Sequence, residues 1–297
     1  MSTSIDPSYR WDGEELDIAA YLARIGFDGE PTPTPATLRR LVFLHTTSLP
    51  FENLEIILGR PVRLDVASLQ DKMVRRRRGG YCFELCALFA AALERLGFGV
   101  TGLAGRIFLG QDNALLPATH ALLRVTTAED DRIWLCDPGF GSGPLAPIEL
   151  APGRGEFVAG AWRFRLEHGR DELGGDLWTL RHFARDGWRT RRTVSMTPQY
   201  RIDQEVGSYY VSTSRHSPFT TRPIVQRIRP EVHHMLDGVT LLTGYPDGTG
   251  ATRQVARADL PEILAEIFDI ELDAADTDQL VHAPWPADQG VVQAVSR

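Results

Sequence analysis

The sequence is organised around Tyr81–Phe98, YCFELCALFAAALERLGF, the strongest helical pattern in the chain. Its apolar residues recur every three or four positions, as on the buried face of a helix, and Gly97 is placed to end it. The pair Gly79-Gly80 stands just before this stretch, and we expect it to let the chain turn tightly into the helix. Cys82 then lies in the first helical turn. The stretch therefore predicts a buried helix that carries a cysteine at its start.

Before this helix, the pattern is helical from about residue 15 onward. A first apolar repeat ends at Gly26, a second helix is expected to start at Thr34-Pro35, and Asp65 is placed to cap a short third one. The N-terminal third is therefore predicted to be a group of helices.

After the helix, from about residue 99, the apolar period changes to two. Short β-like segments separated by Gly and Pro indicate an antiparallel barrel or a sandwich. From about residue 200 the pattern is mixed. The segment VGSYYVSTSRHSPFT (206–220) is expected to be β-rich, and a late helix is expected to be capped by Asp259, with Pro261 in its first turn. The tail after Asp276 is expected to be loosely held.

Composition narrows the class of protein. The 297-residue chain is 43% hydrophobic and 24% charged, which is typical of a globular protein. Its net charge of −7 argues against a general attraction for nucleic acid. No segment resembles a signal peptide or approaches the ~20 apolar residues of a transmembrane helix. We therefore expect a cytoplasmic protein with no nucleic-acid or membrane partner; whether it forms a homo-oligomer stays open.

Cys82 has three possible interpretations. A zinc site is disfavoured because Cys82 and Cys86 are spaced C-x3-C and only Cys136 remains, so we expect no metal. A disulfide between helical positions i and i+4 would be strained. The remaining choice for Cys82 is a core cysteine or a nucleophile, since free N–H groups and the positive end of a helix favour a thiolate there. Cys86 and Cys136 are interpreted as core residues.

A base for such a nucleophile is available in THALLRVTTAEDDRIWLCDPGFG, residues 119–141. If its turn is centred on Ala128-Glu129, His120 and Asp137 are directly opposed on one face of a hairpin, screened by Leu122, Ile133 and Leu135. A buried Asp beside a His fixes its tautomer and stabilises the imidazolium. The alternative is a structural pair of buried side chains without a catalytic role.

Several motifs together resemble the arylamine N-acetyltransferases. RRGGYCFEL, THALLRV and WLCDPGFG are similar, in order, to the Cys, His and Asp signatures of that family, and LPFENLEI, LARIGFDG and YYVSTSRHSPF also match it, over about residues 15–225. The resemblance implies an α+β multidomain fold: a helical bundle over 1–98, an antiparallel β-barrel over 99–215 and an α/β lid over 216–297. It also implies a triad arranged as in cysteine proteases.

The resemblance further implies an activity and its residues. It implies ping-pong acetyl transfer from acetyl-CoA to an arylamine, a hydrazine or an N-hydroxyarylamine, with Cys82, His120 and Asp137 as the triad. Substrate and coenzyme contacts are implied for Phe51, Thr119, Phe140, Gly141 and Phe219. The family habit also suggests that Arg78 pairs with Glu52 and braces the loop before Cys82.

Two residues depart from the family pattern. Cys86 stands where the family usually has Asn, which puts in doubt the hydrogen bonds that this amide makes around the helix. Pro138 stands where it usually has a small aliphatic residue, and it removes a backbone donor directly after Asp137. We expect neither to abolish the triad.

Other functions stay open at this point. An amide synthase of ansamycin-type polyketide biosynthesis, a thiol hydrolase or amidase, and a non-catalytic binder of aromatic ligands could all be built on the same residues. The run Arg75–Arg78 is expected to pair with nearby acids or to lie in solvent, with a coenzyme phosphate contact from Arg75 or Arg76 as the alternative.

Overall fold

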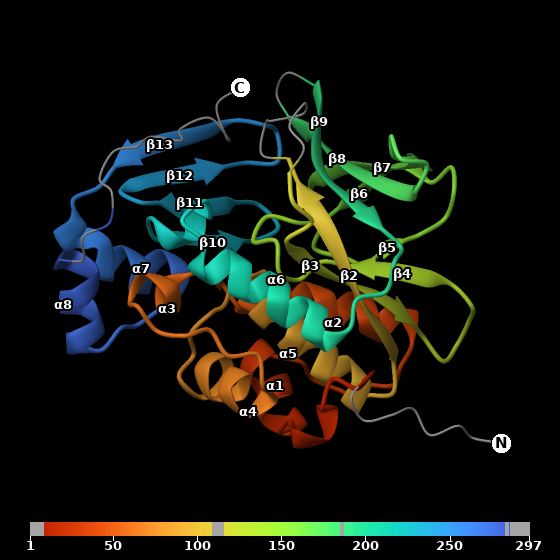
Figure 1. The fold of residues 1–297 in the computed structure, drawn as a ribbon, viewed down its shortest axis with the longest axis horizontal. Coiled ribbons are helices and arrows are strands. Elements are labelled where there is room, and N and C mark those ends of the chain that lie inside the picture. The colour runs from red at the N-terminus through yellow and green to blue at the C-terminus, as the bar shows by residue number, and fades with distance from the viewer. Residues whose placement is uncertain (1–8, 109–115, 185–186, 283–284, 286–297) are drawn as a thin grey trace.

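The computed structural model describes residues 9–108, 116–184, 187–282 and 285. The N-terminal part is helical, as predicted, and lies below two antiparallel sheets in the view of Figure 1. Its elements are a 3₁₀ turn (Gly13–Glu15), α1 (Ile18–Ile25), α2 (Pro35–Ser48), β1 (Phe51–Glu52), α3 (Leu54–Ile57), α4 (Val66–Leu69), a π-helical turn (Gln70–Arg75) and α5 (Cys82–Arg95).

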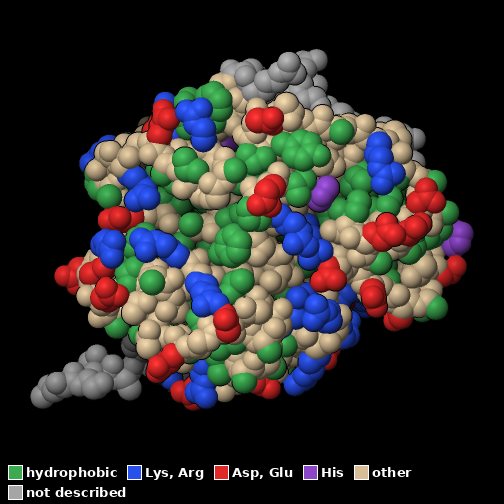
Figure 2. Space-filling model, turned by 180° about the vertical axis from the view of Figure 1, so that it is seen from behind, with side chains coloured by type: hydrophobic (Ala, Val, Ile, Leu, Met, Phe, Trp, Pro, Cys, Tyr) green, Lys and Arg blue, Asp and Glu red, His purple; other side chains and the backbone are tan. Residues whose placement is uncertain are grey.

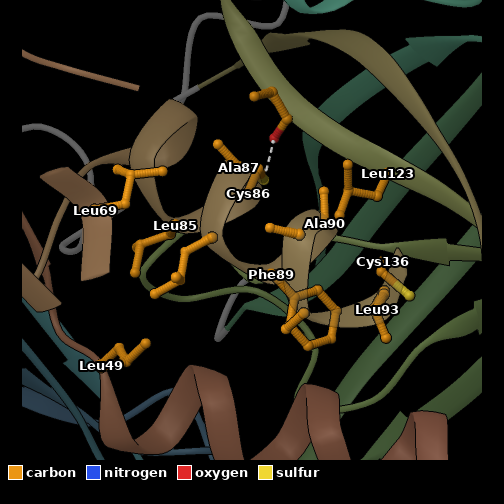
Figure 3. Close-up of a cluster of buried hydrophobic side chains, with 14 of the residues drawn as sticks. Leu49, Leu69, Leu85, Cys86, Ala87, Phe89, Ala90, Leu93, Leu123 and Cys136 are labelled. Carbon is orange, nitrogen blue, oxygen red and sulfur yellow. Dashed lines mark hydrogen bonds between the residues drawn. The ribbon is translucent and has the colours of Figure 1, made fainter. Parts of the chain in front are cut away.

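Helix α5 is the centre of the molecule. Its start is capped by the Glu84 carboxylate, which accepts the Tyr81 backbone N–H at 3.1 Å. Every residue from Cys82 to Leu93 is buried, because helices cover one side and a sheet covers the other. Figure 3 shows Leu49 and Leu69 on the helical side, and Leu123 and Cys136 on the sheet side.

The larger sheet has eight antiparallel strands in the order β5-β4-β3-β2-β9-β8-β7-β6. It is strongly curled, but β5 and β6 are free edges, so the predicted barrel is an open half-barrel. One face packs on α5, and the concave face has its own apolar core around Leu122, Leu135 and Leu180. The strands are β2 (Gly99–Ile107), β3 (His120–Thr126), β4 (Ile133–Cys136), β5 (Ile148–Glu149), β6 (Gly155–Ala159), β7 (Trp162–Arg170), β8 (Asp176–Ala184) and β9 (Gly187–Ser195).

The register of the β3–β4 hairpin differs from the prediction. Leu123 pairs with Cys136, so the register is shifted by two residues, and Asp137 is a diagonal rather than a direct neighbour of His120. The turn is centred one residue later than expected because the Asp130 carboxylate accepts the Arg132 backbone N–H at 3.1 Å and fixes it there. A shift of two keeps every side chain on its face. The expected screening by Ile133 is wrong, since this residue is 37% exposed.

The segment expected to be β-rich contains a helix instead, α6 (Arg201–Thr213). Its start is capped by Asp203, whose carboxylate accepts the Tyr200 N–H at 2.8 Å. Its buried residues Gln204, Ser208 and Val211 recur at helical spacing, whereas the β-favouring tyrosines lie on its exposed face. Helix α6 packs on the start of α5, where the Tyr81 hydroxyl bonds the Ser208 hydroxyl.

The smaller sheet has the order β1-β10-β11-β12-β13, so it takes its first strand from the N-terminal region. Helices α7 and α8 pack against it and α3 through a shared apolar core. Asp259 precedes α7, with Pro261 in the first turn, but its side chain makes no capping hydrogen bond. The remaining elements are β10 (Ile224–Ile228), β11 (His233–Asp237), β12 (Thr240–Gly244), β13 (Gly250–Gln254), α7 (Leu260–Phe268) and α8 (Ala274–His282).

The expectation of a loose tail after Asp276 is wrong for the part that the structure describes. Asp276 lies in α8 and pairs with Arg60 at 2.6 Å, and Trp285 is only 6% exposed. Residues 283–284 and 286–297 lie outside the described residues.

Surface properties agree with the composition. On the face seen in Figure 2, acidic and basic side chains are interspersed rather than gathered by sign. Within the described ranges, no helix combines the length and apolarity needed to cross a membrane.

Candidate active site

Cys82 lies in the first turn of α5, where the sequence places it. Its thiol is free, and the residue is only 4% exposed. The role expected of Gly79-Gly80 needs a correction, since the left-handed residue of this turn is Arg77, at φ 54°. The glycines are needed for space: a Cβ on Gly79 would lie 2.0 Å from the Pro50 carbonyl oxygen. They therefore allow close packing rather than an unusual backbone angle.

His120 and Asp137 form a buried, hydrogen-bonded pair, as predicted. The His120 Nε2 donates to the Asp137 Oδ1 at 2.8 Å, and both residues are 5% exposed. The Cys82 side chain lies within hydrogen-bonding reach of the same imidazole. Because Nε2 is engaged by Asp137, Nδ1 is the nitrogen left for the sulfur. The diagonal register thus still brings together all three side chains predicted from the sequence.

The protonation of His120 follows from its neighbours. Burial alone would lower its pKa, but the charge and the hydrogen bond of Asp137, together with the contact to Cys82, raise the pKa of His120 to about 9. Burial would raise the pKa of Asp137, whereas the charges of Arg192 and His120 lower it. At neutral pH the site therefore holds an imidazolium beside a carboxylate.

Aromatic residues expected near the site lie next to one another. The Phe140 ring meets the His120 ring edge-on, with ring centroids 5.3 Å apart. The ring centroids of Phe51 and Phe219 are 5.7 Å apart. Gly141 joins the two pairs, because a Cβ there would lie 3.0 Å from the Phe51 Cβ. Thr119 is half-buried directly before β3.

The loop after Asp137 is seated on α5. A side chain on Gly139 would lie 2.8 Å from the Cys82 Cα, so glycine allows the loop to touch the backbone of Cys82. Cys86 holds the same loop. Its thiol donates to the Ala121 carbonyl at 3.2 Å (Figure 3). Its sulfur also accepts the Gly139 N–H, which opposes the rise that burial causes in its pKa. Cys86 is buried, as expected, but it is also a hydrogen-bonded bridge between β3 and this loop. Pro138 is buried in the same loop.

A balanced set of charges lies under the start of α5. We call Glu52, Lys72, Arg78 and Glu84 the α5 charge cluster. Arg78 donates to Glu52 at 2.9 Å, which is the contact expected from the sequence, and Lys72 donates to Glu84 at 2.7 Å. The Leu54 N–H donates to the other Glu52 oxygen at 2.6 Å. Burial would raise the pKa of Glu52, but Arg78 and Lys72 lower it to about 2.

The run Arg75–Arg78 pairs with acids, as expected. Arg75 and Arg76 contact Asp71 at 4.0 and 3.0 Å, and Arg77 contacts Asp269 at 3.7 Å. A coenzyme contact by Arg75 or Arg76 stays an untested alternative. Among the described residues, no group of three His, Cys, Asp or Glu side chains could hold a metal ion.

Two arginines of β9 were missed by the sequence reasoning. Arg192 Nη1 lies 2.7 Å from the second oxygen of Asp137, and Arg191 donates to the Ser142 hydroxyl at 2.6 Å. The available signal was the alternation in WRTRRTV, which places Arg192 on the same face as the buried Val194. A charge facing inward on a half-barrel strand is unusual enough to mark a site.

Comparison with known proteins agrees with this geometry. The family model described as N-acetyltransferase matches residues 34–277. The arylamine N-acetyltransferase of Mycolicibacterium smegmatis is 39% identical over 261 residues, which cover 86% of this chain and 93% of the relative. The chain belongs to the arylamine N-acetyltransferase family. It is thereby an acyltransferase.

Solved structures of the arylamine N-acetyltransferase family match the fold closely. The Nocardia farcinica enzyme superposes with a TM-score of 0.92 at 61% identity, covering 95% of this chain and 99% of that one. The Mycobacterium marinum enzyme, solved in complex with CoA, superposes with a TM-score of 0.81 at 32% identity, covering 89% of this chain and 98% of its own. The half-barrel, the helices and the smaller sheet are thus the family fold.

Proposed function

We propose that the chain transfers acetyl groups from acetyl-CoA to arylamines, arylhydrazines and N-hydroxyarylamines, by a ping-pong mechanism through an acetyl-Cys82 intermediate. One observation carries the proposal: Cys82 stands at a helix start beside an imidazole whose far nitrogen is bound by a buried carboxylate. The CoA complex of the Mycobacterium marinum relative supports acetyl-CoA as the donor.

In the resting site, the proton of the Cys82 thiol is already on His120, and the resulting imidazolium holds Cys82 as a thiolate. In the first half-reaction, the sulfur attacks the thioester carbonyl of acetyl-CoA, the bond from that carbon to the CoA sulfur breaks, and the leaving thiolate takes the proton from His120. Exchange of one thioester for another costs little free energy. The backbone N–H groups at the start of α5 are candidate donors to the oxyanion.

In the second half-reaction, the amine attacks the acetyl carbon and His120, now neutral, takes the proton that the nitrogen loses. Cys82 leaves as a thiolate, and the site returns to its starting state. An arylamine is mostly neutral at pH 7, so its lone pair is available. Asp137 stays an anion throughout, since its role is to hold the ring and stabilise its charge.

The aromatic residues suit an aryl acceptor. Phe51 and Phe219 form one ring pair, and Phe140 packs against the base, so an aryl ring placed among them meets apolar faces close to Cys82. We assign Phe51 and Phe219 to the acceptor, and Thr119, Phe140 and Gly141 to the thioester and the arriving coenzyme. Glu52 and Arg78 support the turn that leads into α5.

The test is to mix the chain with acetyl-CoA and a panel of anilines and hydrazines, and to follow free CoA. Wild type is expected to release CoA beyond one equivalent only with an acceptor, Cys82→Ser to release essentially none, and the matched control Cys136→Ser to behave as wild type. Turnover retained in Cys82→Ser would refute the assignment. Release sustained by water alone would instead favour a thiol hydrolase.

A further inference from the structure

A β-bulge in β9 turns two consecutive arginines toward the same place. Leu180 pairs with Arg192 and Arg181 pairs with Thr190, so Arg191 is an extra residue with no partner on β8. Neighbours on a regular strand point to opposite faces, but a bulge re-aims one of them. Here both guanidinium carbons lie near the Phe140 ring, at 5.0 and 5.1 Å from its centroid.

The two arginines have different partners. Arg191 donates to the carbonyl and the hydroxyl of Ser142, at 3.0 and 2.6 Å, and so holds the loop after Asp137. Arg192 lies 2.7 Å from the Asp137 Oδ2, while Oδ1 is bound to His120. Each oxygen of this carboxylate thus has its own cationic neighbour.

Arg192 is held at a cost to the fold. It is 0% exposed, and none of its three guanidinium nitrogens makes a hydrogen bond within the described structure. Its contact with Asp137 has the distance of an ion pair without the angle of a hydrogen bond. Replacing a buried ion pair by apolar residues is often neutral or stabilising, so fold stability gives no reason for an arginine here.

We propose that Arg192 is a positioning residue for acyl transfer: it fixes the orientation of the Asp137 carboxylate and keeps it anionic, so that His120 presents Nδ1 to Cys82. This inference rests on the proposed function. Arg192 makes and breaks no bond in the reaction, because it acts only through Asp137.

The charges around Asp137 support this assignment. The charge of Arg192 is the largest influence that lowers the pKa of Asp137 against burial, ahead of His120 and Arg191. The titratable and charged groups that face this site are Cys82 and Cys86 of α5, His120 of β3, Cys136 of β4, Arg191 and Arg192 of β9, and His233 of β11, which faces Arg191.

The test uses the full chain and reads the site without acyl transfer. Cys82 is alkylated with iodoacetamide between pH 4 and 9, and its modification is followed by mass spectrometry in wild type, Arg192→Met, Arg192→Lys and the control Arg181→Met. Arg181 lies on the neighbouring strand and pairs with Glu167 near the surface. Denaturant unfolding confirms that each variant is folded.

For Arg192→Met, we expect the acid limb of the profile to move to higher pH, because a carboxylate without its cationic neighbour takes up a proton more readily and then no longer stabilises the His120 imidazolium beside Cys82. We expect alkylation at pH 7 to slow at least about tenfold. Arg181→Met is expected to match wild type. A folded Arg192→Met with the wild-type limb and rate overturns the proposal.

Arg192→Lys keeps the charge but loses the fork-shaped head group. We expect its acid limb to stay within about half a pH unit of wild type and its alkylation to slow about five- to tenfold. A lysine variant alkylated at the wild-type rate overturns the positioning role, whether or not the methionine variant folds. If wild type fails to transfer acetyl but the Arg192 variants show the expected changes in alkylation, the proposed function alone has failed. If wild type transfers acetyl but the variants show no such changes, this inference alone has failed.

Discussion

Two groups of buried charges meet at the start of α5, and they differ in how they are balanced. The α5 charge cluster has two cations and two carboxylates, and most of their polar atoms have partners. The group around Asp137 has one carboxylate against Arg191, Arg192 and His120, and Arg192 makes no hydrogen bond among the described residues.

The difference indicates what each group is for. The balanced group holds the turn before Cys82 in place. Its charges compensate one another, so it needs no charge from a substrate. The second group has a positive excess that a thiolate at Cys82, and then an oxyanion on the substrate, would compensate. Buried charge left incompletely paired costs stability and is expected at a working site.

The largest effect is expected from Asp137→Asn, which removes the negative charge from the second group and keeps its shape. Without that charge, His120 no longer holds its proton at neutral pH or keeps its tautomer, so acetyl transfer should fall by about 10³–10⁴-fold. Single-turnover CoA release measures this. A loss of less than about tenfold would mean that His120 works without the carboxylate.

The next effect is expected from Arg78→Met, which unbalances the α5 charge cluster. Removing one partner leaves Glu52 buried and under-compensated, which costs about 3–5 kcal/mol of unfolding free energy. Urea unfolding measures the loss, and the fraction that stays folded should keep a reaction rate within a few-fold of wild type. The exposed pair of Arg132 and Asp130 is the control, with Arg132→Met expected to cost below about 1 kcal/mol.

The stability that the two groups contribute should also be lost on opposite sides of neutral pH. The pKa of His120 is raised from 6.5 to about 9, so its contribution is fully present below pH 6.5 and is lost as the pH rises through 9. The pKa of Glu52 is lowered from 4.5 to about 2, so its contribution is present above pH 4.5 and is lost as the pH falls through 2.

Each of these contributions is at most about 3 kcal/mol. Unfolding free energies measured at pH 6.5 and 9 should show wild type losing stability over that interval and His120→Gln losing less. Equal losses in the two proteins would mean that His120 is not the group that titrates.

The smallest effect is expected from Cys86→Ala, which tests the hydrogen-bonded bridge to the loop after Asp137. Cys136→Ala removes the same volume from the same core, so the difference between the two variants isolates the bridge. We expect Cys86→Ala to cost about 1 kcal/mol more, the usual contribution of a hydrogen bond. Equal unfolding free energies would reduce Cys86 to packing.

Local patterns were sufficient for much of this molecule. The burial of α5, the position of Cys82 in its first turn, and the helix start at Thr34-Pro35 all follow from apolar spacing and capping residues. The His120–Asp137 pair survived a wrong register because a shift of two residues preserves the face.

Tertiary features were harder to predict. The exposed face of α6 carries β-favouring tyrosines, and its helical state depends on packing against Phe83 and Tyr81 of the α5 start. The openness of the half-barrel depends on where β5 and β6 end. The bulge at Arg191 depends on the register in which β8 and β9 pair, so the sequence of either strand alone does not indicate it.

The close backbone contact between Gly139 and Cys82 also has a consequence for the order of folding. Helix α5 is built from local contacts, so we expect it to form early and the loop to reach it only after β3 and β4 have paired and the half-barrel has docked. Until that moment the cysteine has no base beside it and behaves as an ordinary thiol. Fast alkylation of Cys82 during refolding is therefore expected to mark the docking of the sheet, so that reactivity would report the closing of the core.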